Sequence, residues 1–381
     1  MKNLLAITLL LALPFPTQAE ITFEFNYSLS THFQDASEGP ERRAAFEAAA
    51  RGLGSYFENT ATLAVDVVSF SDPGANFIAT AGSEGIDVDI NFFGFIGEVA
   101  HVKAIQGSDE NGAAADGEVS VNFGVDWDLD DEVAADAVDF KATIVHELMH
   151  LMGLQSSIEQ NGSDNFGTPP GDPGVWVPFD KHLTDSIGKP IIATNYSLDR
   201  ARWLSASTGG ASPGSGLFFG GPAARAANGG QAIGLYSPSP WQQGSSTSHL
   251  DDDNPQLAGL VMLAGSDFGP YSRELSPIEL GILTDLGYSL VPEPELALRV
   301  AIDANTNTLT LVGPPGDYVI QESTDMENWS SGSLVRLVGR LPGTLTLTAT
   351  SDQRFIRAAL APTKAAQRVE EDSRSRKRYW R

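Results

Sequence analysis

The chain has 381 residues, and with 41% hydrophobic residues it can bury a sizeable core, which excludes a wholly disordered protein. The formal net charge of −25 disfavours nucleic acid and anionic membranes as partners, because both repel an acidic body. The sequence contains no cysteine, so disulfide bonds are excluded as a source of stability.

The first nineteen residues are typical of an export signal. Lys2 supplies a positive charge, residues 4–13 form an apolar run, and Thr17 and Ala19 offer small side chains for cleavage. The apolar run is too short to span a bilayer, and no other stretch approaches that length. We therefore expect residues 1–19 to be removed, which leaves a secreted, periplasmic or cell-surface protein without a membrane span. The alternative is an apolar N-terminal core strand.

The following part of the chain carries alternating strand and helix signals. Residues 38–57, rich in Ala and Glu with apolar positions at helical spacing, predict an amphipathic helix, and residues 136–154 predict a second, buried helix. Short runs of strand type are predicted at 21–29, 62–70, 86–90 and 119–125. The order of strand, helix, strands and helix indicates a mixed sheet covered by two helices.

Regular patterns fade after residue 154. Segments 167–174 and 205–230 are rich in Gly, Pro or Ser, and they are predicted to be loops. Residues 276–288 predict a helix that begins at a Ser-Pro pair, with Glu279 near its positive end. This part is therefore expected to be loop-rich and to end in a helix.

Residues 291–294, Val-Pro-Glu-Pro, mark a linker. Beyond it, short β-type runs are predicted at 296–300, 308–312, 318–321, 334–338, 345–350 and 355–359. They indicate a separate small all-β module at residues 295–361, whose role in attachment or substrate binding rests on analogy alone. Residues 362–381 are highly charged and are predicted to be disordered.

The predicted buried helix carries the motif His146-Glu-Leu-Met-His150. Residues at i and i+4 lie on one face of a helix, so both imidazoles can reach one cation. Glu147 lies one step round the helix, where its carboxylate can hold a zinc-bound water. Zinc lowers the pKa of that water towards about 7, and the glutamate takes its proton as the water attacks a peptide carbonyl. The alternative is an exposed helix with two incidental histidines.

Zinc held in this way needs a third protein ligand. His182 and His249 are the two histidines that follow the motif, and both are candidates. A glutamate ligand would need a second acidic helix soon after the first, and the sequence offers no convincing one. His32 and His101 lie upstream of the motif and are expected to be structural or surface residues.

The spacing from the two motif histidines to Gly153 resembles that of the metzincin zinc peptidases, in which a glycine turns the chain sharply after the second histidine. Their compact form has a third histidine three residues after the glycine, where this chain has Ser156. Met262, thirteen residues after His249, resembles the methionine of that family's turn. The chain is therefore most similar to the leishmanolysin-like branch and related bacterial secreted peptidases, which carry an insertion before the third histidine. The resemblance covers roughly residues 21–288.

This resemblance implies an α+β fold with a metzincin-like, two-lobed zinc peptidase domain at residues 20–290. The lobe at about 20–153 would hold a mixed sheet with the active-site helix, and the lobe at about 154–290 would be loop-rich, followed by the small all-β module. One catalytic zinc ion is implied, with Met262 in a turn beneath it. The implied site residues are His146, His150 and His249 as zinc ligands and Glu147 as the catalytic base.

The activity implied is that of a secreted zinc metalloendopeptidase, a hydrolase whose protein or peptide substrate lies extended along an edge strand of the sheet. Some metzincins have an oxyanion-assisting tyrosine two residues after the methionine. Ala264 takes that position here, and Tyr271 is the candidate substitute. A catalytically inactive secreted adhesion or binding protein that retains the fold is one alternative, and a zinc hydrolase of a non-peptide bond is another. The intact Glu147 argues against the inactive alternative, since a site released from catalysis has no physical need for that carboxylate.

Two acidic clusters, at 126–132 and 251–253, offer oxygen ligands of the kind that calcium takes. Neither matches the spacing of a calcium-binding loop, so we interpret them as solvated acidic loops and calcium as an unsupported cofactor. The sequence contains no phosphate-binding glycine motif, nucleophile elbow or basic aromatic patch. No pattern in it predicts an oligomeric state.

Overall fold

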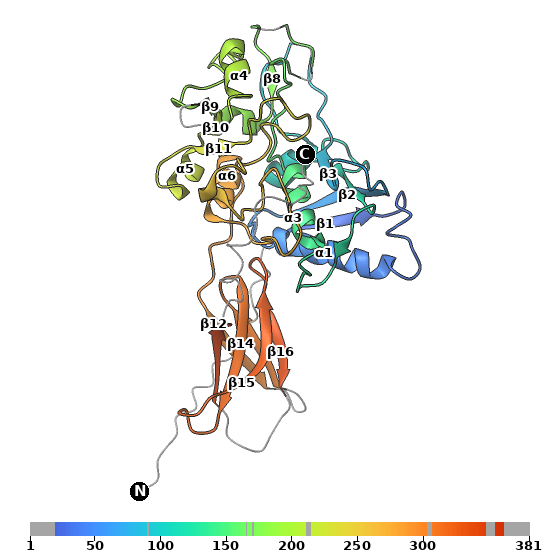
Figure 1. The fold of residues 1–381 in the computed structure, drawn as a ribbon, viewed down its shortest axis with the longest axis vertical. Coiled ribbons are helices and arrows are strands. Elements are labelled where there is room, and N and C mark those ends of the chain that lie inside the picture. Colours follow the sequence, from blue (N-terminus) through green and yellow to red (C-terminus); the bar gives the residue numbers. More distant parts are fainter. Residues whose placement is uncertain are drawn as a thin grey trace. The chain divides into compact units, whose positions relative to one another are not determined.

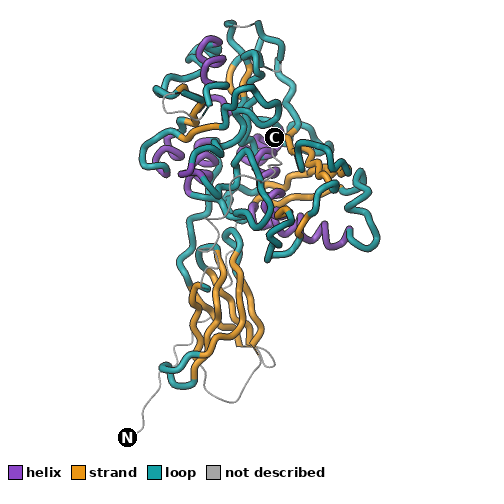
Figure 2. The backbone as a smooth tube through the Cα atoms, in the orientation of Figure 1, coloured by secondary structure: helices purple, strands orange, loops and turns teal. Residues whose placement is uncertain are grey.

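The computed structural model describes residues 20–361 except 90, 165, 170, 211–214, 303–306 and 348–354. The predicted export signal and the charged tail lie outside the described residues. The described residues form two compact units, Glu20–Val291 and a smaller one that begins at Pro292. Helices and several sheets are connected by long loops, so the fold is α+β (Figure 1, Figure 2). In the described part of the chain, no helix is both long and apolar enough to cross a membrane.

The larger unit is built on a four-stranded sheet with the strand order β1-β2-β5-β3. Its strands are β1 (Ile21–Asn26), β2 (Ala61–Phe70), β5 (Gly117–Asn122) and β3 (Ala79–Ser83). β1, β2 and β5 run parallel, whereas β3 pairs antiparallel with β5 and forms an edge of the sheet. The strands predicted at 21–29, 62–70 and 119–125 are confirmed with shifted ends, and β3 is a strand that the sequence did not predict.

A strand was predicted at 86–90, but residues 84–89 form no strand. Residue 90 lies outside the described residues. Asp89 accepts hydrogen bonds from the backbone and the side chain of Asn91, and such local bonds compete with strand pairing. The next strand is β4 (Gly94–Phe95), which pairs in parallel with β8 (Val175–Trp176).

Helices α1 (Gly39–Gly54) and α3 (Phe140–Leu151) contact each other, and they contact β1 and β3 of the sheet respectively. Every residue of α3 except Lys141 is buried, which is the pattern of a helix in the interior of a domain. The helices predicted at 38–57 and 136–154 are thus confirmed as α1 and α3, but both are shorter than predicted, and residues 136–139 precede α3 instead of belonging to it. The remaining short elements of this half are α2 (Val99–Gln106) and the parallel pair β6 (Trp127–Asp128) and β7 (Val138–Asp139).

The chain after α3 consists of short elements. They are the 3-10 helix η1 (Pro178–His182), β9 (Leu183–Asp185), α4 (Arg200–Ala206), β10 (Leu217–Phe219), α5 (Pro222–Ala227), β11 (Ile233–Leu235), the 3-10 helix η2 (Pro255–Leu257) and α6 (Pro277–Asp285). β11, β10 and β9 form a small antiparallel sheet. The loop predicted at 205–230 is therefore wrong over β10 and α5, which are too short to show a periodic pattern.

The helix predicted at 276–288 is confirmed as α6. It packs so closely on α5 that a Cβ at Gly281 would lie 2.6 Å from the Cα of Ala224.

The smaller unit holds two antiparallel sheets, with the strand orders β12-β13-β16 and β15-β14-β17. The strands are β12 (Ala297–Ile302), β13 (Asn307–Val312), β14 (Gly316–Ser323), β15 (Ser330–Leu337), β16 (Gly343–Leu347) and β17 (Phe355–Leu360). Each predicted β-run of this region overlaps one of these strands. The buried side chains are Leu309, Leu311, Tyr318, Ile320, Val335 and Leu337. The unit therefore has a hydrophobic core of its own.

Candidate metal centre

His146 and His150 project from the same face of α3. The side chain of Asp139 caps the start of this helix by accepting a hydrogen bond from the backbone of Ala142 at 3.0 Å. Because one helical turn separates the two histidines, their Nε2 atoms lie 3.0 Å apart. The two residues are only 1% and 7% exposed. The helix thus places two buried imidazole nitrogens next to each other.

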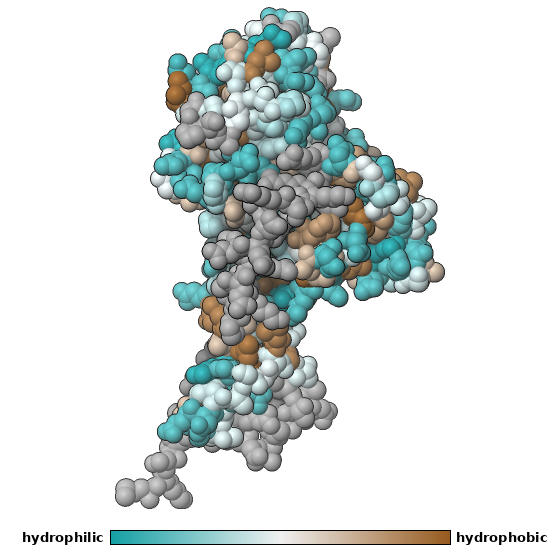
Figure 3. Space-filling model, in the orientation of Figure 1, coloured by the Kyte–Doolittle hydropathy of each residue, from teal (hydrophilic) through white to brown (hydrophobic). Residues whose placement is uncertain are grey.

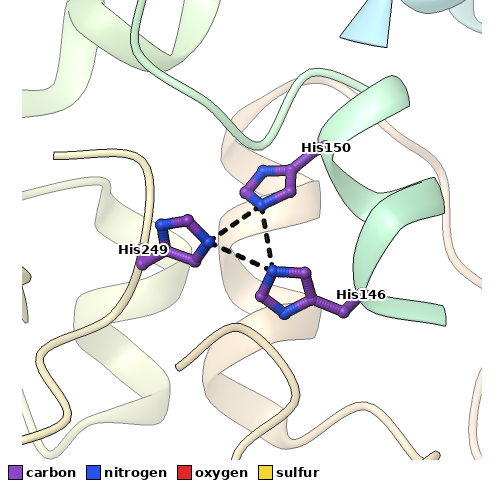
Figure 4. Close-up of side chains that lie close together, drawn as sticks. All are labelled: His146, His150 and His249. Atoms are coloured by element: carbon purple, nitrogen blue, oxygen red, sulfur yellow. Dashed lines mark hydrogen bonds between the residues drawn. The ribbon is translucent and has the colours of Figure 1, made fainter. Parts of the chain in front are cut away.

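His249 reaches the same point from a distant loop. Its Nε2 lies 3.1 Å from the Nε2 of each of the other two histidines (Figure 4). The loop is fixed by two backbone hydrogen bonds to Tyr236, one accepted from its N–H by the carbonyl of His249 and one donated to its carbonyl by the N–H of Thr247. The three buried imidazoles are close enough to hold one metal ion.

A backbone carbonyl fixes the tautomer of each imidazole. The Nδ1-to-oxygen pairs are His146 to Val261 (2.8 Å), His150 to Leu154 (2.9 Å) and His249 to Ser245 (2.8 Å). These acceptors assign the proton of each ring to Nδ1, which leaves the lone pair on Nε2. Three lone pairs then face one another with no proton between them, an arrangement that a bound cation stabilises.

Burial keeps the three imidazoles neutral. It lowers the pKa of His150 to about 3 and the pKa of His249 to about 4. It also lowers the pKa of His146 well below its usual range, and the two neighbouring imidazoles add to that effect. Because neutral imidazole is the form that binds metal, no proton has to leave Nε2 at neutral pH.

The donor set fits zinc. Three histidines are the protein ligands of one class of catalytic zinc site, in which the fourth position stays open. Zinc–nitrogen distances of about 2.0–2.1 Å in a tetrahedral site place the ligand nitrogens about 3.3–3.4 Å apart. The observed separations of 3.0–3.1 Å therefore require only a slight outward shift. Imidazole also suits copper, iron and nickel, so the geometry shows a cluster that could hold a metal ion without naming the metal.

The cluster lines a cavity of about 400 Å³. The edge strand β3 contributes Ala79, Thr80 and Ala81 to the wall, and the loop before His249 contributes several residues between 243 and 248. Glu147 lines this cavity as well. The sheet edge, the metal-binding nitrogens and a carboxyl group therefore border one space.

Glu147 is 2% exposed, and among the described residues none donates a hydrogen bond to its carboxylate. Burial raises the pKa of this carboxyl to about 8, because desolvation disfavours the charged form. A cation close by would favour the carboxylate instead. Glu147 is therefore expected to lose its proton more readily when a cation lies close to it.

Met262 is fully buried in a turn beside the cluster. Its carbonyl accepts a hydrogen bond from the N–H of Leu250 at 2.7 Å, and its own N–H donates to Oε1 of Glu279 at 2.8 Å. The preceding carbonyl, that of Val261, holds the Nδ1–H of His146. The turn at the predicted methionine thus contacts both chain segments that carry histidines.

The chain turns sharply after α3 at Gly153, whose φ of +93° lies in the left-handed region that favours glycine. Three residues later, the N–H of Ser156 donates to Oγ of Ser248 at 3.1 Å. The position that holds a histidine in the compact metzincin pattern therefore ties the end of α3 to the residue before His249.

His182, the rival third ligand, lies away from the cluster. Its Nε2–H donates to the carbonyl of Asp285 at 3.1 Å, and its ring packs on Phe219. His101 is also structural, as expected, because its Nε2–H donates to the carbonyl of Leu286 at 2.9 Å. These two histidines anchor the end of α6.

Tyr271 does not line the cavity. Its hydroxyl donates to the carbonyl of Gly265 at 3.4 Å and accepts from the N–H of Asp267 at 3.3 Å. The geometry therefore gives no support to Tyr271 as a replacement for the oxyanion-assisting tyrosine.

The acidic clusters bond to their own backbone. The carboxylates of residues 251–253 lie within 4.8 Å of one another, and Asp251 accepts a hydrogen bond from the N–H of Asp253. In the other cluster, Asp128 accepts from the N–H of Asp130. These are the bonds of acidic turns, and they add no support for calcium.

The sequence placed Glu279 only at the start of a predicted helix, whereas the structure also joins it to the turn beside the cluster. Its carboxylate also closes a capping box at the start of α6, where Oε2 accepts from the N–H of Ser276 at 2.8 Å. Burial raises the pKa of Glu279, and hydrogen bonds from the backbone of Ser276, Met262 and Val261 act in the opposite direction. The spacing of Ser276 and Glu279 signals the capping box, but no local pattern signals the contact with Met262.

Comparison with known proteins gives no relative. No protein-family model, no curated protein and no solved structure matches this chain. The function is therefore inferred from the geometry of the site and from the motif that forms it.

Proposed function

We propose that the chain is an exported zinc-dependent endopeptidase of the metzincin type. The observation that carries the proposal is the convergence of three unprotonated Nε2 atoms, 3.0–3.1 Å apart, in a cavity that Glu147 also lines. In this proposal the larger unit is the peptidase domain, with lobes at about 20–153 and 154–290, and residues 1–19 direct export. His146, His150 and His249 would hold the zinc.

Zinc is proposed because the ligands are three neutral imidazoles and two of them come from a His-Glu-x-x-His helix. A bound zinc ion supplies Lewis acidity, which polarises a carbonyl oxygen and lowers the pKa of water to about 7. The carbonyls of Val261, Leu154 and Ser245 keep the three imidazoles in the orientation that this role requires.

Glu147 would act as the general base and then as the general acid. It takes a proton from the attacking water while the oxygen of that water bonds to the scissile carbonyl carbon. It then gives the proton to the amide nitrogen as the carbon–nitrogen bond breaks. Because the water itself attacks, no side chain is acylated.

The substrate would be a peptide in extended conformation. β3 is an edge strand, and its residues 79–81 line the cavity. An extended peptide can pair with the exposed edge of a sheet through main-chain hydrogen bonds. The small side chains of Ala79 and Ala81 leave room for the substrate beside the strand.

Replacing Glu147 by Gln tests the proposal, because the amide keeps the size of the side chain and removes its basicity. The variant should bind one zinc ion per chain, as the wild type does, and cleave casein about 10²–10⁴-fold more slowly. Zinc content is measured by metal analysis and cleavage by release of soluble peptides.

A wild-type protein that binds one zinc ion and cleaves no peptide would contradict the proposal. It would leave a zinc hydrolase of another bond, or a secreted binding protein that retains the fold. Equal cleavage by the wild type and the Glu147→Gln variant would exclude Glu147 as the base.

A further inference from the structure

The turn at Val261 and Met262 joins the two segments that carry the cluster histidines. The carbonyl of Val261 accepts the Nδ1–H of His146 at 2.8 Å. The carbonyl of Met262 accepts the N–H of Leu250, the residue after His249, at 2.7 Å. Any displacement of this turn therefore moves an imidazole of α3 and the backbone beside the third histidine together.

Glu279 holds that turn in place. Its Oε1 accepts from the N–H of Met262 at 2.8 Å, and its Oε2 accepts from the N–H of Ser276 at 2.8 Å. The side chain is 0% exposed. Since the two oxygens are committed to different segments, the carboxylate fixes the turn to the start of α6.

We propose that Glu279 is a positioning residue of the metal centre. Its carboxylate preorganises the turn at Val261 and Met262, and through the turn it orients His146 and the segment of His249. Groups that hold the ligands of a metal influence its affinity although they never touch it. The proposal rests on the metal site of the proposed function, but not on the bond that the enzyme cleaves.

A Glu279→Gln variant tests the proposal. The amide has one acceptor oxygen, so either the N–H of Met262 or that of Ser276 loses its partner, whichever way the group turns. We expect zinc to bind about 10–100-fold more weakly in competition with a chromophoric chelator. We also expect a changed visible absorption spectrum after cobalt replaces zinc. Unchanged affinity and an unchanged spectrum would overturn the proposal.

A Ser276→Ala variant is the matched control. It removes the hydroxyl that accepts from the N–H of Glu279 at 3.2 Å, and it leaves the bond between Glu279 and Met262 in place. We expect a lower melting temperature with zinc affinity and the cobalt spectrum as in the wild type. If both variants lose zinc affinity to the same degree, Glu279 acts only through the stability of α6, and the proposal is overturned.

Hydrogen exchange in the zinc-free wild type gives a second test, which holds even if the Glu279→Gln variant does not fold. Because Glu279 holds the turn without help from a metal, the N–H of Met262 should exchange as slowly as core amides before zinc is added. Fast exchange that becomes slow only with zinc would show that the metal orders the turn, and the inference would fail. A protein that meets these expectations but cleaves no peptide would refute the proposed peptidase activity and leave the role of Glu279 intact.

Discussion

The proton on Nδ1 decides what the opposite nitrogen of each cluster histidine can do. The carbonyls that hold these protons belong to Val261, Leu154 and Ser245, which lie on three separate segments. Three converging lone pairs cost stability in the metal-free protein, and a bound cation removes that cost. Zinc is therefore expected to stabilise the folded chain, because it binds the folded state in preference to the unfolded one.

A His249→Ala variant should lose tight zinc binding, since α3 alone offers only two ligands to the ion. The affinity for zinc should fall by more than about 100-fold. This loss exceeds the one expected from removing a group that only hydrogen-bonds to a ligand of the metal. Equilibrium dialysis followed by metal analysis measures the change. His182→Ala is the control and should bind zinc as the wild type does, because His182 bonds to Asp285. Zinc retained by the His249→Ala variant would show that the third ligand is another residue.

At the scale of the elements, the end of α3 depends on one glycine. Gly153 has a φ of +93°, and a Cβ there would lie 3.3 Å from the ring of His101. Gly107 ends α2 with a φ of +70° and has nothing within 4 Å of an added Cβ. Both glycines have a positive φ, but only at Gly153 would an added Cβ meet a neighbouring side chain.

Gly153→Ala should therefore destabilise the protein more than Gly107→Ala does. The left-handed backbone costs about 1–2 kcal/mol in each variant, and the contact with His101 adds to the cost at Gly153. Urea unfolding of the two variants beside the wild type measures the difference. Equal losses at both sites would mean that the ring of His101 moves away without cost.

The start of α2 introduces a pH dependence of stability. Burial raises the pKa of Glu98 to about 7, and Gln155 donates a hydrogen bond to this carboxylate at 3.0 Å. In the unfolded chain the pKa of a glutamate is about 4.3. The folded state therefore favours the protonated carboxyl, and the stability that this provides is complete below about pH 4.3 and is lost as the pH rises through about 7.

A Glu98→Gln variant should remove this dependence, because its amide keeps an acceptor for Gln155 and carries no charge. Between pH 4.5 and 7.5 the wild type should lose about 1–3 kcal/mol of unfolding free energy relative to the variant, a range discounted for the partial exposure of Glu98. Urea denaturation at several pH values measures both proteins. Parallel stability curves would show that Glu98 titrates alike in the folded and unfolded chains.

At the scale of the whole molecule, the described chain divides into two units with separate cores. The histidine cluster, its cavity and Glu147 all belong to Glu20–Val291. On the face shown in Figure 3, many described residues are hydrophilic, and hydrophobic residues form smaller patches among them. The end of the larger unit is anchored at Val291, whose N–H donates to the carbonyl of Tyr56 at 2.8 Å.

A chain that ends after Val291 should therefore keep one bound zinc ion and the main unfolding transition of the full protein. A chain that ends after Gly287 is the control, because it also loses Tyr288. That tyrosine is 3% exposed and donates to the carbonyl of Met152 at 2.8 Å, so its loss should cost about 3 kcal/mol or more. Calorimetry with metal analysis checks both. Loss of zinc from the chain that ends after Val291 would mean that the smaller unit supports the site.

Local patterns predicted the helical half of the site. The spacing of His146 and His150 needs only that α3 forms. It forms because Ile144, Leu148 and Leu151 give it an apolar stripe at helical spacing and Asp139 caps its start. Local patterns also predicted α1 from its apolar spacing, α6 from the Ser-Pro pair at its start, and the strands of the smaller unit from short β-type runs. They missed β3, α2 and α5, because such short elements take their stability from tertiary contacts more than from their own sequence.

The spacing of His249 and Met262 favoured His249 over His182 only by resemblance, and it is the tertiary structure that brings His249 to the cluster. It also joined Met262 to Glu279, and it supplied the carbonyls that orient the three imidazoles. The contact of His146 with Val261 links distant segments of the chain, and Met262 and Glu279 also lie on separate segments. Leu154 and Ser245 each lie four residues from the histidine they hold, and all of these contacts use a backbone group. Every residue type carries the same backbone carbonyl, so no pattern of side chains marks the ones that a fold will use. The sequence by itself placed two histidines and a glutamate on one helix, whereas the approach of a third histidine was decided by the packing of the loops against α6.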